Sequence, residues 1–464
     1  MWWLRNVWMV DPGQGIDGRR DVLVEGERVA CVARNLTRDE VRSQAGGETV
    51  EIVEGQGKYL FPGLIDVHTH LREPGFEETE DIQSGAAAAI KGGFTAVLAM
   101  ANTNPVLDQR ALVEYVRHRG EQAGLARVLP VAAVSKGLRG EELVEMHELK
   151  EAGAVAFSDD GRPLANAEVM RLALEYAKIT GLPIISHCED PNLAQDGLMH
   201  LGAVSLRLGL KGIPASAEAA MVARDLLLAE ETGGKLHLAH ISSKASVELI
   251  RQAKANGVNV TAEVNPHHLI FCDEDVSLSS TSLKVNPPLR SRADRRALQE
   301  ALRDGTIDMI ATDHAPHAWE EKCRPLADAP CGINGLETSL AAVWQYLVEP
   351  GCLSALRLVE AWSLNPARRF GLSGGTLRPG EPADMILFDP NCREMVTRAS
   401  LCSKSSNTPF LDQELQGFAV MAWVGGRLLL KNREIVRTEP PAAARRAWSE
   451  VSGETAGRTW VANA

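Results

Sequence analysis

The chain has 464 residues and a formal net charge of −12, and 45% of its residues are hydrophobic. This length suits one large domain plus a small one, and the acidic balance argues against nucleic acid or an anionic membrane as a partner. The 8 cysteines include no Cys-x-x-Cys pair, which favours reduced thiols over a disulfide framework. No apolar run approaches membrane-spanning length, and the first residues lack the basic region of a signal peptide. We therefore expect a soluble, cytoplasmic protein.

Both ends of the chain carry short β-like segments separated by turn residues. The N-terminal ones are expected at 7–10, 21–25, 28–32 and 50–53, and the C-terminal ones at 384–388, 418–424 and 427–430. Two β-rich ends around a different middle predict one small β-sandwich domain, built from residues 1–59 and 375–436. The Pro- and Ala-rich tail, 437–464, is expected to be disordered or to form a helix packed outside.

The middle of the chain, 60–374, alternates between strand-like and helix-like segments. The expected strands are 64–67, 95–100, 127–134, 154–158, 182–186, 235–239, 258–264 and 307–311. The expected helices between them are 82–91, 109–122, 141–152, 166–180, 215–232, 243–256 and 292–304. This alternation predicts an α/β fold, a (β/α)₈ TIM barrel.

Histidines and aspartates recur where these strands end. In a strand, residues i and i+2 share a face, so His68 and His70 can point at one ion. Each such residue alone has an ordinary explanation as a surface group or a turn, but the carboxyl ends of barrel strands meet on one face. Together they make a ligand set for two divalent ions such as Zn²⁺. The candidates are His68, His70, Asp159 or Asp160, His187, His240 and Asp313.

The other histidines give weaker signals. His118, His147 and His200 lie in helical or loop segments and are expected to be solvated. His237 lies three residues before His240, so we expect it on the opposite side of its strand, in the core or against a helix. A further pair, His267 and His268, follows strand seven and is expected to support the site indirectly.

Several segments carry a family resemblance in the same order as in the family. They are Pro62-Gly-Leu-Ile-Asp-Val-His-Thr-His-Leu-Arg-Glu-Pro-Gly75, Asn102-Thr-Asn-Pro105, Phe157-Ser-Asp-Asp-Gly161, Ser186-His-Cys-Glu189, Asn286-Pro-Pro-Leu-Arg290, Ala311-Thr-Asp-His-Ala-Pro-His317, Gly332-Ile-Asn-Gly-Leu-Glu-Thr338 and Ser405-Ser-Asn-Thr-Pro-Phe410. With them the chain resembles the amidohydrolase superfamily and, within it, the bacterial-type class I dihydroorotases. It departs from the family pattern at Asn265, where a Thr is usual, and in its additional C-terminal tail.

The resemblance implies how the metal ligands are shared between one or two zinc ions. It assigns His68 and His70 to one ion. It assigns His187 and His240 to the other, with Asp160 as the bridge. Spacing by itself leaves Asp159 and Asp160 undistinguished, so this choice rests on the resemblance alone.

The resemblance also implies a reaction, the reversible cyclisation of N-carbamoyl-L-aspartate to (S)-dihydroorotate in pyrimidine biosynthesis. Asp313 would be both a metal ligand and the proton shuttle. The substrate carboxylate would bind Arg72, Asn102 and His317, and Arg72 offers the planar fork that suits a carboxylate. The dihydropyrimidine ring would lie against Asn286, Cys331 and Gly332.

Two other readings stay open. Dihydropyrimidinases and allantoinases open similar cyclic amides, but they usually bridge their metals with a carboxylated lysine at the end of strand four, and residues 153–163 contain no lysine. A non-catalytic dihydroorotase-like subunit that supports aspartate transcarbamoylase would have lost metal ligands, whereas this chain keeps all six. Homodimer formation and association with aspartate transcarbamoylase are both compatible with the sequence.

Overall fold

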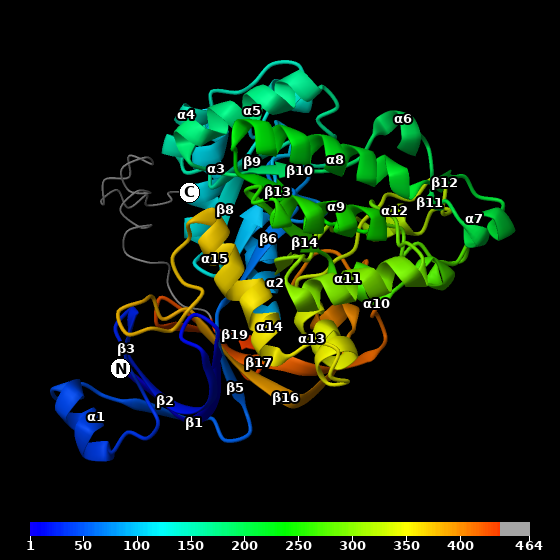
Figure 1. Cartoon of the computed structure of the whole chain (residues 1–464). Helices are drawn as coiled ribbons and strands as arrows, with labels where there is room; N and C mark the ends of the chain where they lie inside the picture. The colour runs from blue at the N-terminus through cyan, green and yellow to red at the C-terminus, as the bar shows by residue number, and fades with distance from the viewer. Residues whose placement is uncertain (437–464) are drawn as a thin grey trace, which may run out of the picture.

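The computed structural model describes residues 1–436, and its central feature is a barrel of eight parallel strands (Figure 1). Each strand pairs with the next along the chain, as a right-handed βα repeat requires. The barrel strands are β6 (Leu64–Thr69), β7 (Phe94–Ala99), β8 (Arg127–Ala132), β9 (Ala156–Ser158), β10 (Ile184–Ser186), β13 (Leu236–Leu238), β14 (Val260–Val264) and β15 (Met309–Ile310). The predicted (β/α)₈ fold is confirmed.

The first and last strands meet through a small number of contacts that close the ring. Thr69 forms a parallel bridge with His314, and the His70 amide donates to the His314 carbonyl at 2.8 Å. The buried carboxylate of Asp66 accepts the Thr312 amide at 3.0 Å and also its hydroxyl group. These bonds hold the residues just after β15 beside the two histidines of β6.

Helices pack around the outside of the barrel, between successive strands (Figure 1). Many begin at a side chain that accepts a backbone N–H of the first turn, as Asp81, Asn166, Ser243 and Ser291 do. The helices that follow barrel strands are α2 (Ile82–Gly92), α3 (Arg110–Ala123), α4 (Met146–Ala152), α5 (Ala167–Thr180), α8 (Ala215–Thr232), α9 (Lys244–Ala255), α11 (Arg292–Asp304), α13 (Ser339–Val343), α14 (Ala355–Val359) and α15 (Asn365–Phe370). None of the described helices is long and apolar enough to cross a membrane.

Shorter elements fill the connections. After β10 the chain makes an excursion, residues 190–213, before it enters α8. Its elements are α6 (Pro191–Ala194), β11 (Met199–His200), α7 (Ala203–Leu208) and β12 (Gly212–Ile213). The remaining short helices are η1 (Lys136–Leu138), α10 (Pro266–Ile270), η2 (Asp273–Asp275), α12 (Trp319–Lys322), η3 (Trp344–Val348), η4 (Glu360–Leu364) and η5 (Arg398–Ser400).

Strands from both ends of the chain form a second sheet beside the barrel, the blue and orange strands in the lower part of Figure 1. The junction is antiparallel pairing of β5 with β16, from Tyr59 opposite Phe388 to Pro62 opposite Met385. Its members are β1 (Trp2–Asp11), β2 (Ile16–Glu25), β3 (Arg28–Ala33), β4 (Glu51–Glu54), β5 (Tyr59–Pro62), β16 (Met385–Met395), β17 (Glu414–Val424), β18 (Arg427–Lys431) and β19 (Glu434–Ile435). The prediction of a small β domain built from both termini is confirmed.

One element of the small domain was not predicted. Helix α1 (Arg38–Ala45) lies in a region expected to hold only strands and turns. Thr37 caps it, and the Glu40 carboxylate accepts the Thr37 amide at 2.8 Å, which completes a capping box that is visible in the sequence as Thr-x-x-Glu. The expectation for the tail, 437–464, lies outside the described residues.

Candidate active site

Six polar side chains converge at the carboxyl end of the barrel, where parallel strands bring their C-termini to one face. All six are buried, the most exposed being Asp313 at 9%. They come from β6 and from the residues that directly follow β6, β9, β10, β13 and β15. The structure thus brings together every residue that was expected to bind metal: His68, His70, Asp160, His187, His240 and Asp313.

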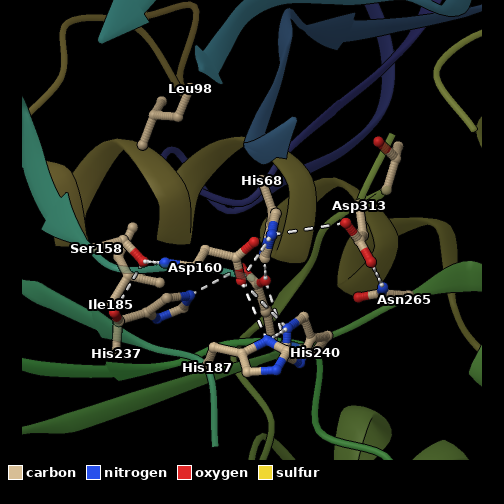
Figure 2. Close-up of polar contacts among 12 residues, drawn as sticks. His68, Leu98, Ser158, Asp160, Ile185, His187, His237, His240, Asn265 and Asp313 are labelled. Carbon is tan, nitrogen blue, oxygen red and sulfur yellow. Dashed lines mark hydrogen bonds and ion pairs between the residues drawn. The ribbon is translucent and has the colours of Figure 1, made fainter. Parts of the chain in front are cut away.

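Asp160 lies at the centre of this cluster (Figure 2). Its Oδ1 is 3.4 Å from His68 Nε2, and it lies at the same distance from His187 Nδ1 and His240 Nε2. Its Oδ2 is 3.4 Å from His70 Nε2. The ligand atoms therefore form two triads that share Asp160, and within each triad they lie within 4.8 Å of one another.

The donor set of these triads fits divalent metal ions. His68 Nε2 and Asp160 Oδ1 are buried and have no hydrogen-bond partner among the described residues. A buried polar atom without a partner is costly, so such atoms usually meet a water or an ion. Burial alone would raise the pKa of Asp160, but the charge of His68 and the nearby rings of His187 and His240 hold it well below its usual value. A carboxylate among imidazoles is one of the ligand sets that bind divalent ions such as zinc.

Asp313 lies beside the triad of His68, His70 and Asp160. Its Oδ1 is 3.1 Å from His70 Nε2 and 3.6 Å from His68 Nε2, and its Oδ2 accepts from Asn265 Nδ2 at 3.3 Å. The backbone of Asp313 has a φ of 48°, a left-handed conformation that a non-glycine residue adopts at a cost and that clusters at functional sites. Asn265, the residue that departs from the family pattern, thus contacts the carboxylate expected to move the proton.

The rings of His68 and His70 are oriented by partners that contact the Nδ1 atom of each. His68 Nδ1 lies 2.7 Å from Glu263 Oε1, and the other oxygen of Glu263 lies 2.9 Å from His237 Nε2. His70 Nδ1 lies 2.9 Å from Asn102 Oδ1. Such partners fix the ring orientation and tautomer of a ligating histidine.

Sequence reasoning missed Glu263 and gave His237 no role. Glu263 is the one charged residue in its strand, and that signal could have found it. His237 is fully buried, as expected of a core residue, and its second ring nitrogen is 2.8 Å from Thr261 Oγ1. Together with His68 these residues form a hydrogen-bonded chain that runs down into the barrel.

The structure distinguishes Asp159 from Asp160, between which the sequence spacing could not choose. Asp159 accepts the Val134 amide at 2.7 Å and the Ser135 amide at 3.0 Å, as well as the Ser135 hydroxyl group. Its side chain therefore fastens the loop that follows β8, whereas Asp160 faces the histidines. Of the two, Asp160 is the one whose carboxylate lies within 3.4 Å of all four histidines.

A cavity of about 340 Å³ opens above the cluster. Sequence reasoning missed the wall that the excursion after β10 contributes, including Gln195 and Leu198, because nothing in those residue types marks a binding site. All six residues expected to contact substrate line the cavity: Arg72, Asn102, Asn286, His317, Cys331 and Gly332.

The cavity is lined by a cationic side chain and by a hydrogen-bond acceptor that has no partner among the described residues. Arg72 Nε donates to the Pro316 carbonyl at 3.2 Å, and its NH2 is 3.4 Å from His317 Nε2. Burial and the Arg72 charge lower the pKa of His317 to about 3, so this imidazole is neutral. Asn286 Oδ1 is buried and has no partner among the described residues, so it can accept a bond from a ligand.

The pair that follows β14 lies behind these residues. His267 Nε2 is 3.3 Å from Asn265 Nδ2, and His268 Nε2 is 2.9 Å from the Pro287 carbonyl. Both histidines are buried. Their contacts support Asn265 and the loop that carries Asn286, in keeping with the expected indirect role.

Comparison with known proteins identifies the family. The family model described as Dihydro-orotase-like matches residues 57–246. The dihydroorotase of Pelotomaculum thermopropionicum is 51% identical over 427 residues, 92% of this chain and 98% of that protein. The dihydroorotase of Pelobacter propionicus is 49% identical over 428 residues, 92% and 99% of the two chains. Among solved structures, the L-hydantoinase (dihydropyrimidinase) from Arthrobacter aurescens superposes with a TM-score of 0.81 at 25% identity, covering 95% of this chain and 98% of the other. The chain belongs to the dihydroorotase family.

Proposed function

We propose that the protein catalyses the reversible, zinc-dependent cyclisation of N-carbamoyl-L-aspartate to (S)-dihydroorotate. The observation that carries this proposal is a half-buried guanidinium group, Arg72, in the same cavity as the two ligand triads. The cavity therefore offers a carboxylate site beside an amide-hydrolysing centre. The relatives named dihydroorotase support the same reaction.

The two triads divide the proposed metal ligands. His68 and His70 would hold one ion, and His187 and His240 the other, with Asp160 shared between them. One or two zinc ions bound there would polarise the ring carbonyl and acidify a water molecule.

Arg72 would bind the substrate carboxylate. The chain as a whole carries a net charge of −12, so an anionic substrate needs a local cation. A guanidinium group can form two parallel hydrogen bonds to a carboxylate. Asn102 and His317 lie in the same cavity and can add neutral donors, while the unpartnered Asn286 oxygen can accept a ring N–H.

Asp313 would move the proton. Burial alone would raise the pKa of this carboxyl group, but His68 and His70 hold it well below its usual value, so it is ionised and ready to act as a base. In ring opening it takes a proton from the attacking water and gives one to the departing ring nitrogen. By microscopic reversibility the same carboxyl group serves ring closure.

The other readings fit this cavity less well. Dihydropyrimidinase and allantoinase substrates have no carboxylate for Arg72, and an aspartate rather than a lysine stands among the histidines at the end of β9. A non-catalytic subunit would not need to keep both ligand triads. A cytoplasmic location, a homodimer and association with aspartate transcarbamoylase stay predictions.

The test is an assay of the purified protein in both directions with metal analysis of the same sample. We expect opening of dihydroorotate and closure of carbamoyl aspartate, loss of both after chelation, and recovery with added zinc. Dihydrouracil and allantoin serve as comparison substrates. Turnover of either one as fast as that of dihydroorotate would contradict the assignment.

A further inference from the structure

Residues 326–332, here called the wall segment, end in the cavity-lining residues Cys331 and Gly332 and are held by side chains that lie outside the cavity. Lys284 follows α10 in the chain and is 6% exposed. Its Nζ donates to the carbonyls of Leu326 at 2.6 Å, Ala327 at 3.1 Å and Ala329 at 2.6 Å. The Gly332 amide returns a bond of 2.9 Å to the Lys284 carbonyl.

A second buried ammonium group continues this row of contacts. Lys322, at the end of α12, is also 6% exposed, and its Nζ donates to the Pro330 carbonyl at 3.0 Å and to the Gly332 carbonyl at 3.1 Å. Burial and the Lys284 charge lower the pKa of Lys322 to about 8. Burying an ammonium group is costly unless its donors are satisfied, so these carbonyls must stay in place around it.

Asn407 joins the wall segment to the loop that follows β15. Its Nδ2 donates to the Gly332 carbonyl at 3.1 Å and to the Ala315 carbonyl at 3.0 Å. Its Oδ1 accepts the His317 amide at 3.2 Å, and the residue is 5% exposed. It belongs to the Ser405–Phe410 motif, which had no assigned role. The Asn407 side chain thus links two cavity residues, His317 and Gly332, through hydrogen bonds to their backbones.

We propose that Lys284, Lys322 and Asn407 are positioning residues that set the spacing between His317 and the wall segment and thereby the affinity for substrate. This inference rests on the proposed function. The metal ligands are held instead by Glu263 and Asn102. Loss of the contacts made by these three positioning residues, here called the clamp, should therefore raise KM more than it lowers kcat. That pattern is the sign of a lost binding interaction rather than a lost chemical step.

The first experiment compares Asn407→Ala with Asn365→Ala. Asn365 Nδ2 also donates to a backbone carbonyl, that of Asp308 at 2.9 Å, but near the other end of β15. For Asn407→Ala we expect KM for dihydroorotate to rise about tenfold or more, kcat to change by less than about threefold, and metal content to stay at the parent level. Hydrogen exchange of the wall-segment amides should also accelerate by about tenfold. The Asn365→Ala control should show neither change.

A second pair of variants keeps the test decisive if Asn407→Ala does not fold. Lys322→Met removes the donors to Pro330 and Gly332, whereas Lys322→Gln keeps N–H groups for the same carbonyls. Higher KM with faster exchange in the Met variant, and substantial recovery in the Gln variant, supports the proposal. Unchanged exchange, or unchanged KM despite faster exchange, overturns it. A parent protein that leaves dihydroorotate untouched would overturn the proposed function instead, while the exchange measurement still decides whether the clamp exists.

Discussion

The two sides of the cavity are built in different ways. The metal side consists of residues in or directly after barrel strands, whose positions are set by the sheet and by partners such as Glu263 and Asn102. The substrate side consists of loop residues such as His317 and Gly332, whose backbone amide or carbonyl groups are held by side chains of other segments. In the proposed function, the chemistry would therefore depend on residues held by the rigid barrel, and substrate recognition on loops that other side chains hold in place.

This difference predicts that variants on the metal side lower metal content and kcat. Variants on the substrate side should instead change the affinity for substrate and the choice of substrate. Strained backbone occurs on both sides: φ is 34° at His240 and 48° at Asp313, and it is 65° at Arg72. The four predictions below test whether the two sides behave separately.

The largest effect is expected from Asp160→Ala. This change removes the ligand shared by both triads, so bound metal should fall and activity should be lost. Asp159→Ala should keep its metal but lose about 1–3 kcal/mol of stability, because the Val134 and Ser135 amides lose their acceptor. Metal analysis and thermal unfolding of both variants check this. Recovery of the apo-protein only when bicarbonate accompanies zinc would instead point to a carboxylated lysine.

Asp313→Asn tests the proton shuttle on the metal side. The amide has a similar shape but cannot carry the proton, so kcat should fall by about 10²–10⁴-fold in both directions. Metal should be largely retained, because His68, His70, His187, His240 and Asp160 are untouched. Turnover in each direction, measured with metal content on the same sample, decides the matter. Near-parent rates in a metal-replete variant would remove Asp313 from the mechanism.

Arg72→Met tests the substrate side. Loss of a charge-assisted bond to a carboxylate is worth about 1.5–3 kcal/mol, so kcat/KM for dihydroorotate should fall about 10- to 100-fold. Metal content should not change. The slow turnover of dihydrouracil, which has no carboxylate, should be the same in parent and variant. Equal losses on both substrates would mean that Arg72 acts on the centre rather than on the carboxylate.

The smallest effect is a pH dependence of stability at Lys322. Its pKa is lowered from the usual 10.5 to about 8 in the folded protein, so the unfolded chain binds more protons between these values. This lysine therefore contributes more stability as pH rises through that window. The parent should gain stability relative to Lys322→Met between pH about 7.5 and pH about 10, measured as urea midpoints. Lys431→Met, at an exposed lysine, is the control, and an unchanged Lys322 difference would contradict the prediction.

Much of the barrel could be predicted from local pattern. Largely apolar strands such as 95–100, alternating with amphipathic helices that begin at Asn166 or Ser243, set the (β/α) order by periodicity and capping alone. Parallel strands must end on one face, so the convergence of His68, His187 and His240 followed from the order of the elements. The sequence predicted that the two β-rich ends of the chain share one domain, but it did not predict that β5 pairs with β16.

Other features depended on contacts between residues far apart in the chain. Spacing could not choose between Asp159 and Asp160, because a loop conformation decides which carboxylate faces the histidines. Nothing local to Glu263 names His68 as its partner, 195 residues away. Likewise, Asn407 reaches Gly332 across 75 residues because the small domain packs its 401–413 segment against the barrel mouth. Sequence pattern determined the elements and their order, whereas side-chain hydrogen bonds formed only on tertiary packing decided which polar groups meet.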